Sequence, residues 1–239
     1  MAEHSIAPRR RGSAARAYHH GDLRQALLER AIVVIGERGH LDFTLRELAR
    51  DLGVSHAAPY RHFADKAALV TALAVEASGA LGARIEAALA GAGRALRARF
   101  LAAGRAYVGF ALDRPAEFAA LFSPEVDALD PVVVASKARM FGVLLAFIAE
   151  AQAAGAFAKG PPEALAATIW AMHQGLAVLA VSGAFDADRR RRSPAQAPEL
   201  WRAVDAANVA LLDGLVQRRR APPRAKPALG FAPSFVKRR

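Results

Sequence analysis

Residues 44–66, with the sequence TLRELARDLGVSHAAPYRHFADK, constrain the fold of this 239-residue chain more than any other segment. Thr44 precedes Glu47 by three residues, the spacing of a capping box, in which each side chain bonds the other residue's backbone N–H. Apolar side chains then recur at the spacing of one helix face: Leu45, Leu48, Ala49 and Leu52. Gly53 tolerates the positive φ that ends a helix in a sharp turn. The segment therefore predicts a short amphipathic helix followed by a tight turn.

A second short helix is expected directly after this turn, over about residues 56–63. Ser55 is a suitable cap for it. Pro59 falls in or just past its first turn, where a missing N–H costs little. Asp65 then caps a longer helix that begins near Lys66. Two short helices around a glycine turn are typical of a helix-turn-helix, whose second helix lies in the major groove of DNA.

The same pattern also occurs in proteins that do not bind DNA, so periodicity alone leaves a purely structural role open. Three further features extend the pattern: the Gly-Val-Ser turn at residues 53–55, the run Tyr60–Phe63 and the pair Asp65-Lys66. Together with the two short helices, they resemble the TetR family of transcriptional regulators. Residues 18–24, YHHGDLR, also resemble the start of the first helix in a bacterial subgroup of that family. Beyond Leu73 the likeness is one of helical organisation and a few local motifs.

Glycine, proline and polar clusters divide the rest of the chain into helices. We expect these to span about residues 22–39, 66–90, 95–112, 116–122, 131–154, 163–183 and 199–217. No strand-like alternation and no internal repeat is visible. The prediction is an all-α protein: a three-helix helix-turn-helix domain at 21–66, then a helical bundle at 67–217 for ligand binding and dimerisation. A basic arm at 1–20 and a basic, proline-rich tail at 218–239 are expected to be disordered.

The net charge of +11 and the pI of about 11.0 favour polyanionic partners. The charge is nevertheless not concentrated in the helix-turn-helix, because residues 1–66 carry 11 basic and 8 acidic side chains. The excess lies in Arg9–Arg11, in Arg189–Arg192 and in residues 218–239. An alternative therefore stays open: non-specific binding of nucleic acid or another polyanion through these basic segments.

Enzymatic chemistry finds little support in the sequence. The absence of cysteine excludes disulfides, thiol catalysis and cysteine-ligated metals. None of the common nucleophile, phosphate-loop or zinc-protease motifs occurs. We read His19-His20 as part of a polar arm, and the acidic cluster at 125–130 as a solvated loop. No enzymatic activity, no cofactor and no metal site are expected.

Two segments bear on localisation. The first 13 residues lack the apolar core of a signal peptide, so a cytoplasmic protein, associated with the nucleoid when bound to DNA, is expected. Residues 164–185 carry no charge and are long enough to cross a bilayer. His173, Gln174 and Ser182 within this segment favour a helix buried in a bundle or dimer interface, and no membrane partner is expected.

The family resemblance implies which residues meet double-stranded DNA. Those expected to face bases or backbone are Ser55, His56, Ala57, Pro59, Tyr60 and His62. Those expected at phosphates, which position a protein without reading sequence, are Thr44, Tyr60, Arg61 and Lys66. Arg46 completes the predicted DNA-binding set. The arm at Arg9–Arg16 is expected to reach the minor groove or phosphates.

The C-terminal bundle is a candidate sensor for a largely apolar small molecule. Effector pockets are mostly apolar with a few orienting polar groups. The residues expected to line one are Phe110, Phe118, Phe122, Met140, Phe141, Trp170, His173 and Gln174, although each also fits an ordinary core position. The run Trp170–Gly175 resembles the Trp…His-Gly signature of one TetR-type C-terminal domain. Here Gln174 separates the His from the Gly, which leaves the role of His173 open.

The resemblance implies a ligand-responsive homodimer, a repressor acting on a near-palindromic operator. The last two long helices are expected to pair with their copies in the partner subunit. A ligand would then change the separation of the two DNA-reading helices, which must match half-sites about one helical turn apart. A third possibility is a ligand-binding module that has lost DNA binding, against which the intact helix-turn-helix sequence argues.

Overall fold

The computed structural model of the protein describes residues 23–185 and 198–217. The predicted arm at 1–20, which includes Arg9–Arg16, lies outside these residues, and so does the part of the YHHGDLR motif before Leu23. The same holds for Arg189–Arg192 and for the tail at 218–239.

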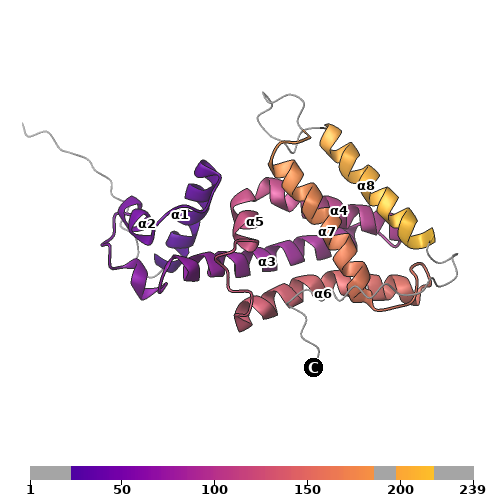
Figure 1. Cartoon of the computed structure of the whole chain (residues 1–239), viewed down its shortest axis with the longest axis horizontal. Coiled ribbons are helices and arrows are strands. Elements are labelled where there is room, and N and C mark those ends of the chain that lie inside the picture. The colour runs from indigo at the N-terminus through magenta and orange to yellow at the C-terminus, as the bar shows by residue number, and fades with distance from the viewer. Residues whose placement is uncertain (1–22, 186–197, 218–239) are drawn as a thin grey trace, which may run out of the picture.

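Within the described ranges the regular elements are all helices and no strand occurs, as the all-α prediction requires. The elements are α1 (Leu23–Arg38), α2 (Leu45–Asp51), the 3₁₀-helix η1 (Pro59–Arg61), α3 (Lys66–Gly91), α4 (Leu96–Asp113), α5 (Pro115–Leu121), α6 (Pro131–Ala153), α7 (Pro162–Val181) and α8 (Pro198–Gln217). Figure 1 shows α1 and α2 at one end, with α3 leading away from them into the bundle formed with α4 to α8. The predicted bounds agree with these to within a few residues.

The start of α2 is built as the capping pattern predicts. The Thr44 hydroxyl accepts the Glu47 N–H at 3.1 Å, and the Glu47 carboxylate accepts the Thr44 N–H at 2.7 Å. Gly53 follows α2 with a φ of +69°, the left-handed conformation expected of the turn. Asp65 caps α3 by accepting the Ala68 N–H at 2.8 Å.

The second helix of the motif is shorter than predicted. Instead of a helix over residues 56–63, the structure has one 3₁₀ turn at η1, preceded by a turn in which the Ala58 N–H donates to the Ser55 carbonyl at 2.9 Å. Pro59 has no N–H to donate to that same carbonyl, so an α-helical ladder cannot begin there. The Ser55 hydroxyl does not cap the element, which starts at Ala58 without a side-chain cap. The prediction was wrong in the length and cap of this helix.

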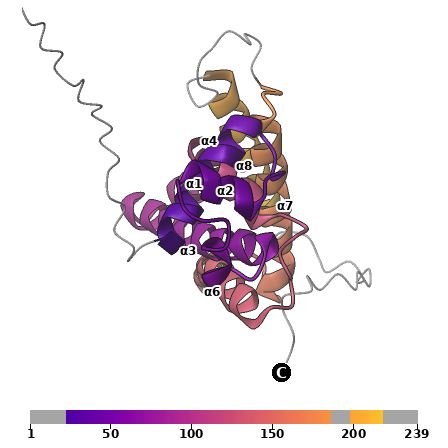
Figure 2. The same ribbon diagram turned by 90° about the vertical axis from the view of Figure 1, so that its left-hand side faces the viewer.

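The core of the N-terminal region continues past residue 66. It joins α1, α2 and the first half of α3 to α5 and the start of α6, with buried members that include Leu27, Leu48, Phe63, Leu73, Ala120 and Val133. Figure 2, seen from the α1 and α2 end, shows α3 passing back from them toward the bundle. The helix-turn-helix end is therefore packed directly on elements of the bundle.

The bundle is formed around α4, which packs on α3, α7 and α8, while α6 packs on α3 and α7. By length and composition alone, α3, α6 and α7 could each cross a membrane. In the folded chain α6 packs on both α3 and α7, which buries part of each of these apolar helices. Polar links also hold α8 to its neighbours: Arg105 and Arg97 of α4 form ion pairs with Asp205 and Asp213, and His173 of α7 bonds Asn208.

Candidate nucleic-acid interface and internal cavities

An exposed surface at α2 and η1 gathers many of the residues predicted to meet DNA. Arg46, His56, Ala57 and Tyr60 surround a shallow hollow. The Tyr60 side chain is 48% exposed, so a large aromatic ring with a hydroxyl group stands in solvent. The predicted residues Ser55, Arg61 and His62 are exposed beside it. The two elements thus present hydrogen-bonding and cationic groups on one face.

Pro59 does not belong to this exposed set. It is buried, and the prediction that it faces DNA is therefore corrected. Its ring forms part of the interior under the turn, while the residues on both sides of η1 remain accessible.

Two of the predicted phosphate contacts are engaged within the protein. The Thr44 side chain is exposed, but its hydroxyl takes part in the capping box with Glu47. The hydrogen bonds from Thr44 lower the pKa of the Glu47 carboxyl group. The Lys66 ammonium lies 2.7 Å from the Glu125 carboxylate and 5.2 Å from the centroid of the Phe43 ring. A phosphate would have to compete with Glu125 for Lys66.

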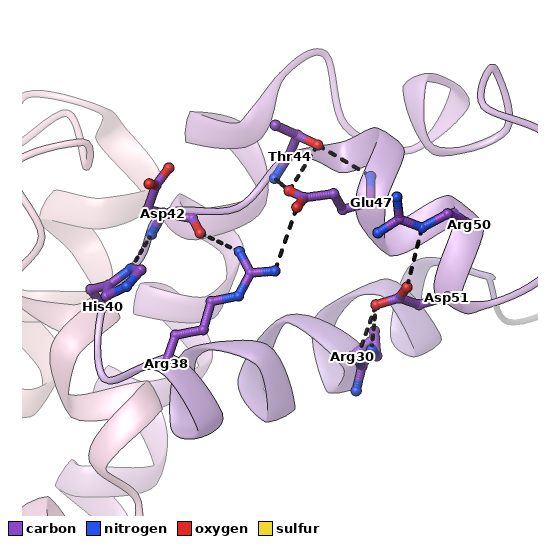
Figure 3. A network of polar contacts seen from close by, with 8 residues as sticks. All are labelled: Arg30, Arg38, His40, Asp42, Thr44, Glu47, Arg50 and Asp51. Atoms are coloured by element: carbon purple, nitrogen blue, oxygen red, sulfur yellow. Dashed lines mark hydrogen bonds and ion pairs between the residues drawn. The ribbon is translucent and has the colours of Figure 1, made fainter.

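A polar network fixes α2 against α1 (Figure 3). Arg38 donates to the Asp42 carbonyl at 2.6 Å and to the Glu47 carboxylate at 3.4 Å. Arg30 donates twice to the Asp51 carboxylate, at 3.0 and 2.9 Å. Both ends of α2 are therefore tied to the first helix, which keeps the exposed face in one orientation.

The bundle encloses a cavity of about 60 Å³ between α3, α4, α6 and α7. Its lining residues are Ile85, Leu89, Phe100, Ala103, Gly104, Tyr107, Met140, Phe141, Leu144, Phe147, Ile169, Trp170 and His173. Apart from the indole of Trp170, the polar groups among them come from Tyr107 and His173. A second cavity of about 70 Å³ is lined by Leu121, Phe122, Lys137, Met140, Phe141 and Trp170.

The structure brings most of the predicted pocket residues to these cavities. Met140, Phe141 and Trp170 line both, His173 lines the first and Phe122 the second. Phe110 and Phe118 lie in the buried core instead, and line neither cavity. Gln174 also lies away from the lining and accepts a hydrogen bond from Tyr107 at 2.5 Å.

Sequence reasoning missed the contribution of α4. Residues 100, 103, 104 and 107 all line the first cavity and recur at the spacing of one helix face. That periodicity was a usable signal. The sequence did not show that this face lies opposite α6 and α7.

His173 links α7 to α8 through a buried hydrogen bond. Its Nδ1 lies 2.7 Å from the Ile169 carbonyl oxygen and its Nε2 lies 2.8 Å from the Asn208 amide oxygen. Burial lowers the pKa of His173, and the two hydrogen bonds partly oppose that shift. Gly104 of α4 lies against the pair: a Cβ there would be 2.5 Å from His173 Nε2 and from both amide atoms of Asn208.

Tyr107 is the other polar group of the first cavity. It donates to Gln174 and accepts the indole N–H of Trp170 at 3.2 Å. Burial raises the pKa of Tyr107, so the phenol stays neutral at physiological pH. The first cavity therefore offers no charged side chain to a ligand.

An all-α chain whose exposed helix-turn-helix surface is packed on a bundle with internal cavities has the architecture of a DNA-binding regulator. Residues 27–73 match the family described as bacterial regulatory proteins, tetR family, and residues 100–204 match the tetracyclin repressor-like C-terminal domain. The chain belongs to the TetR family of transcriptional regulators.

Solved structures agree with this assignment. The chain is similar to a protein with unknown function from Rhodococcus sp. RHA1, at 35% identity over 84% of this chain and 100% of that one, with a TM-score of 0.69. A putative TetR family regulator from Shewanella sp. PV-4 shares the fold, at 22% identity over 79% and 95% of the two chains, with a TM-score of 0.60. So does the TetR family regulator PfmR from Thermus thermophilus, at 19% identity over 79% and 98%, with a TM-score of 0.59. No curated protein matches the sequence.

Proposed function

We propose that the protein is a ligand-responsive repressor that acts as a homodimer on a near-palindromic operator, in the cytoplasm and on the nucleoid. The observation that carries this proposal is the exposed face of Arg46, His56, Ala57 and Tyr60, held in place by the capping box of α2. The family assignment supports regulation through DNA. The exposure of these four side chains supports the proposal that this face contacts the bases of the operator.

Roles within that face follow from chemistry and exposure. Ser55, His56, Ala57, Tyr60 and His62 are proposed to approach base edges, because they are exposed at the turn and at η1. Arg46, Arg61 and Thr44 are proposed to contact phosphates from the sides. Lys66 joins them only when it leaves Glu125.

Dimerisation is proposed to use α7 and α8. Three of the large exposed apolar side chains lie near the end of α7, namely Val178, Leu179 and Val181, and another, Val216, lies near the end of α8. A run of exposed apolar side chains on α7, with one more at the far end of α8, favours a protein partner. A two-fold axis through this face would pair two DNA-reading surfaces, which a near-palindromic operator requires.

The first test is recovery of genomic DNA fragments by the purified full-length protein at about 150 mM salt, which screens diffuse charge attraction. The proposal expects a few fragments that share a near-palindromic sequence. Fragments without a shared sequence, lost steeply as salt rises, would instead favour the polyanion-binding alternative suggested by the net charge of +11. A chain lacking residues 221–239 separates the two further, because only non-specific binding should depend on that basic tail.

Tyr60→Ala tests the reading surface itself. The ring is half exposed, so its loss should leave the helical circular dichroism unchanged. Affinity for the recovered operator should fall by at least about 10-fold, the scale of one lost base contact. Anisotropy of a labelled operator measures this, with the exposed Glu37→Ala on α1 as control. Operator affinity that survives Tyr60→Ala would rule out a base-contacting role for this ring.

A further inference from the structure

The second cavity contains a cation without a counter-charge. Lys137 of α6 lines it together with aromatic and aliphatic side chains. Across the described ranges its ammonium has neither an ion pair nor a hydrogen bond, and it is half-buried. Burial alone lowers the pKa of Lys137, without an opposing carboxylate. A cation partly removed from water in an apolar setting is costly unless an anion compensates it.

The two cavities adjoin, because Met140, Phe141 and Trp170 line both. Phe141 and Trp170 meet edge to face with their ring centroids 5.9 Å apart. Met140 is the flexible member of this shared wall, since its unbranched thioether adopts many shapes at little cost. Its sulfur accepts only a long contact from the Ser78 hydroxyl, at 3.8 Å. Displacement of this shared wall, of which Met140 is the most adaptable part, would connect the two spaces.

The connected space would be asymmetric in its chemistry. Lys137 lies at one end, and it falls three and four residues before Met140 and Phe141, on the same face of α6. The other end is closed by Phe100, Phe147 and further apolar side chains. The polar groups of that end are already bonded within the protein: Tyr107 to Gln174 and His173 to Asn208.

We propose that the joined cavities bind a small amphipathic carboxylate, whose anionic group pairs with Lys137 and whose apolar body passes Met140 into the first cavity. The proposal rests on the ligand-responsive function proposed above and names its ligand class. Each cavity is well below the volume of about 300 Å³ at which ligand pockets begin. Binding must therefore displace side chains of the shared wall, which moves α6 relative to α7.

The test uses three probes with one apolar body and different charge: 4-phenylbutyrate, 4-phenylbutan-1-ol and 4-phenylbutylamine. Isothermal titration calorimetry of the full-length protein without DNA should show the carboxylate binding about 10-fold more tightly than the alcohol, and the amine most weakly. Because no DNA is present, the result is independent of operator recognition. If the carboxylate binds through Lys137 but leaves operator affinity unchanged, the proposed ligand response of DNA binding is wrong, whereas the proposed class of ligand stands.

Variants at residue 137 locate the anionic group. Lys137→Met keeps the length and apolar stem of the side chain, so the alcohol should bind as before while the preference for the carboxylate disappears. Lys137→Arg should retain that preference. Lys159→Met removes a lysine from the exposed loop after α6 and should change neither affinity. Equal affinities of acid and alcohol in the unaltered protein, a preference that survives Lys137→Met, or no binding of any probe at about 5 mM would each overturn the proposal.

Discussion

Gly104 is the residue on which the junction of α4, α7 and α8 depends. A methyl group there would lie 2.5 Å from His173 and Asn208, and both of these side chains are buried. We expect Gly104→Ala to destabilise the protein by about 1–3 kcal/mol, although alanine is the better helix former. Gly79→Ala, on an exposed face of α3 with no atom within 4 Å, is the matched control and should stabilise by up to about 1 kcal/mol. Urea unfolding measures both, and equal effects of the two changes would contradict the tight junction.

His173 makes the same junction sensitive to pH. Its pKa in the folded chain is lowered by burial, whereas in the unfolded chain it takes up a proton near pH 6.5. Below that pH the unfolded state binds more protons than the native state, so this residue lowers stability as the pH falls. Protonation of this one residue changes the free energy of unfolding by up to about 1.4 kcal/mol per pH unit.

The measurement for His173 is the free energy of unfolding at pH 7.5, 6.5 and 5.5. In His173→Gln, which has an amide to reach Asn208 but no group that titrates, the decline toward pH 5.5 should be shallower than in the unaltered chain. Parallel declines in the two proteins would show that other groups set the pH dependence.

At the scale of elements, helix limits followed from local chemistry and could be predicted. Thr44 and Asp65 mark helix starts because a side-chain oxygen satisfies a free N–H a few residues away, which needs no tertiary information. The length of the second helix was overestimated, because the prediction followed the helix-turn-helix pattern and gave too little weight to the missing N–H of Pro59. Phe100 and Tyr107 were missed as cavity residues because their role depends on which helices α4 meets, and no local signal gives that.

The contact between α3 and the α5–α6 loop is a second outcome that sequence reasoning did not give. Lys66, predicted at a phosphate, is bonded to Glu125, so the start of α3 is attached to the bundle next to the proposed DNA-reading surface. If Lys66 also serves a phosphate, Glu125 competes with DNA for it. Glu125→Gln should then raise affinity for all DNA sequences about equally and steepen the salt dependence by about one unit of slope.

Lys66→Ala should act in the opposite direction, weakening all sequences and making the salt dependence shallower by about one unit. The control for Glu125→Gln is Glu86→Gln, which removes an equal charge from an exposed site on α3. Anisotropy titrations at several salt concentrations with operator and random duplexes give both quantities. A sequence-selective change, or equal effects of the two Gln substitutions, would refute direct competition between Glu125 and phosphate.

At the scale of the whole molecule, the fold explains which positions can test the dimer. A charge at Leu176 or Leu211 would lie on α7 or α8, the last two long helices. Leu176 and Leu211 are, however, half-buried against the subunit's own core, so a charge there would also disturb the monomer. Leu179 is 47% exposed, and a change at this position leaves the subunit core intact.

Leu179→Glu should therefore convert the proposed dimer into folded monomers, because two-fold symmetry would bring the carboxylate into the interface from both subunits. Light scattering should report the mass of one 25.3 kDa chain, with unchanged helical circular dichroism. Val132→Glu, at a 59% exposed site on α6, is the matched control and should stay dimeric. Monomers should also lose most operator affinity, because the second half-site is no longer bound by a linked subunit. If Leu179→Glu remains dimeric, the dimer is formed by another surface, and the separation of the two DNA-reading faces cannot be set by α7 and α8.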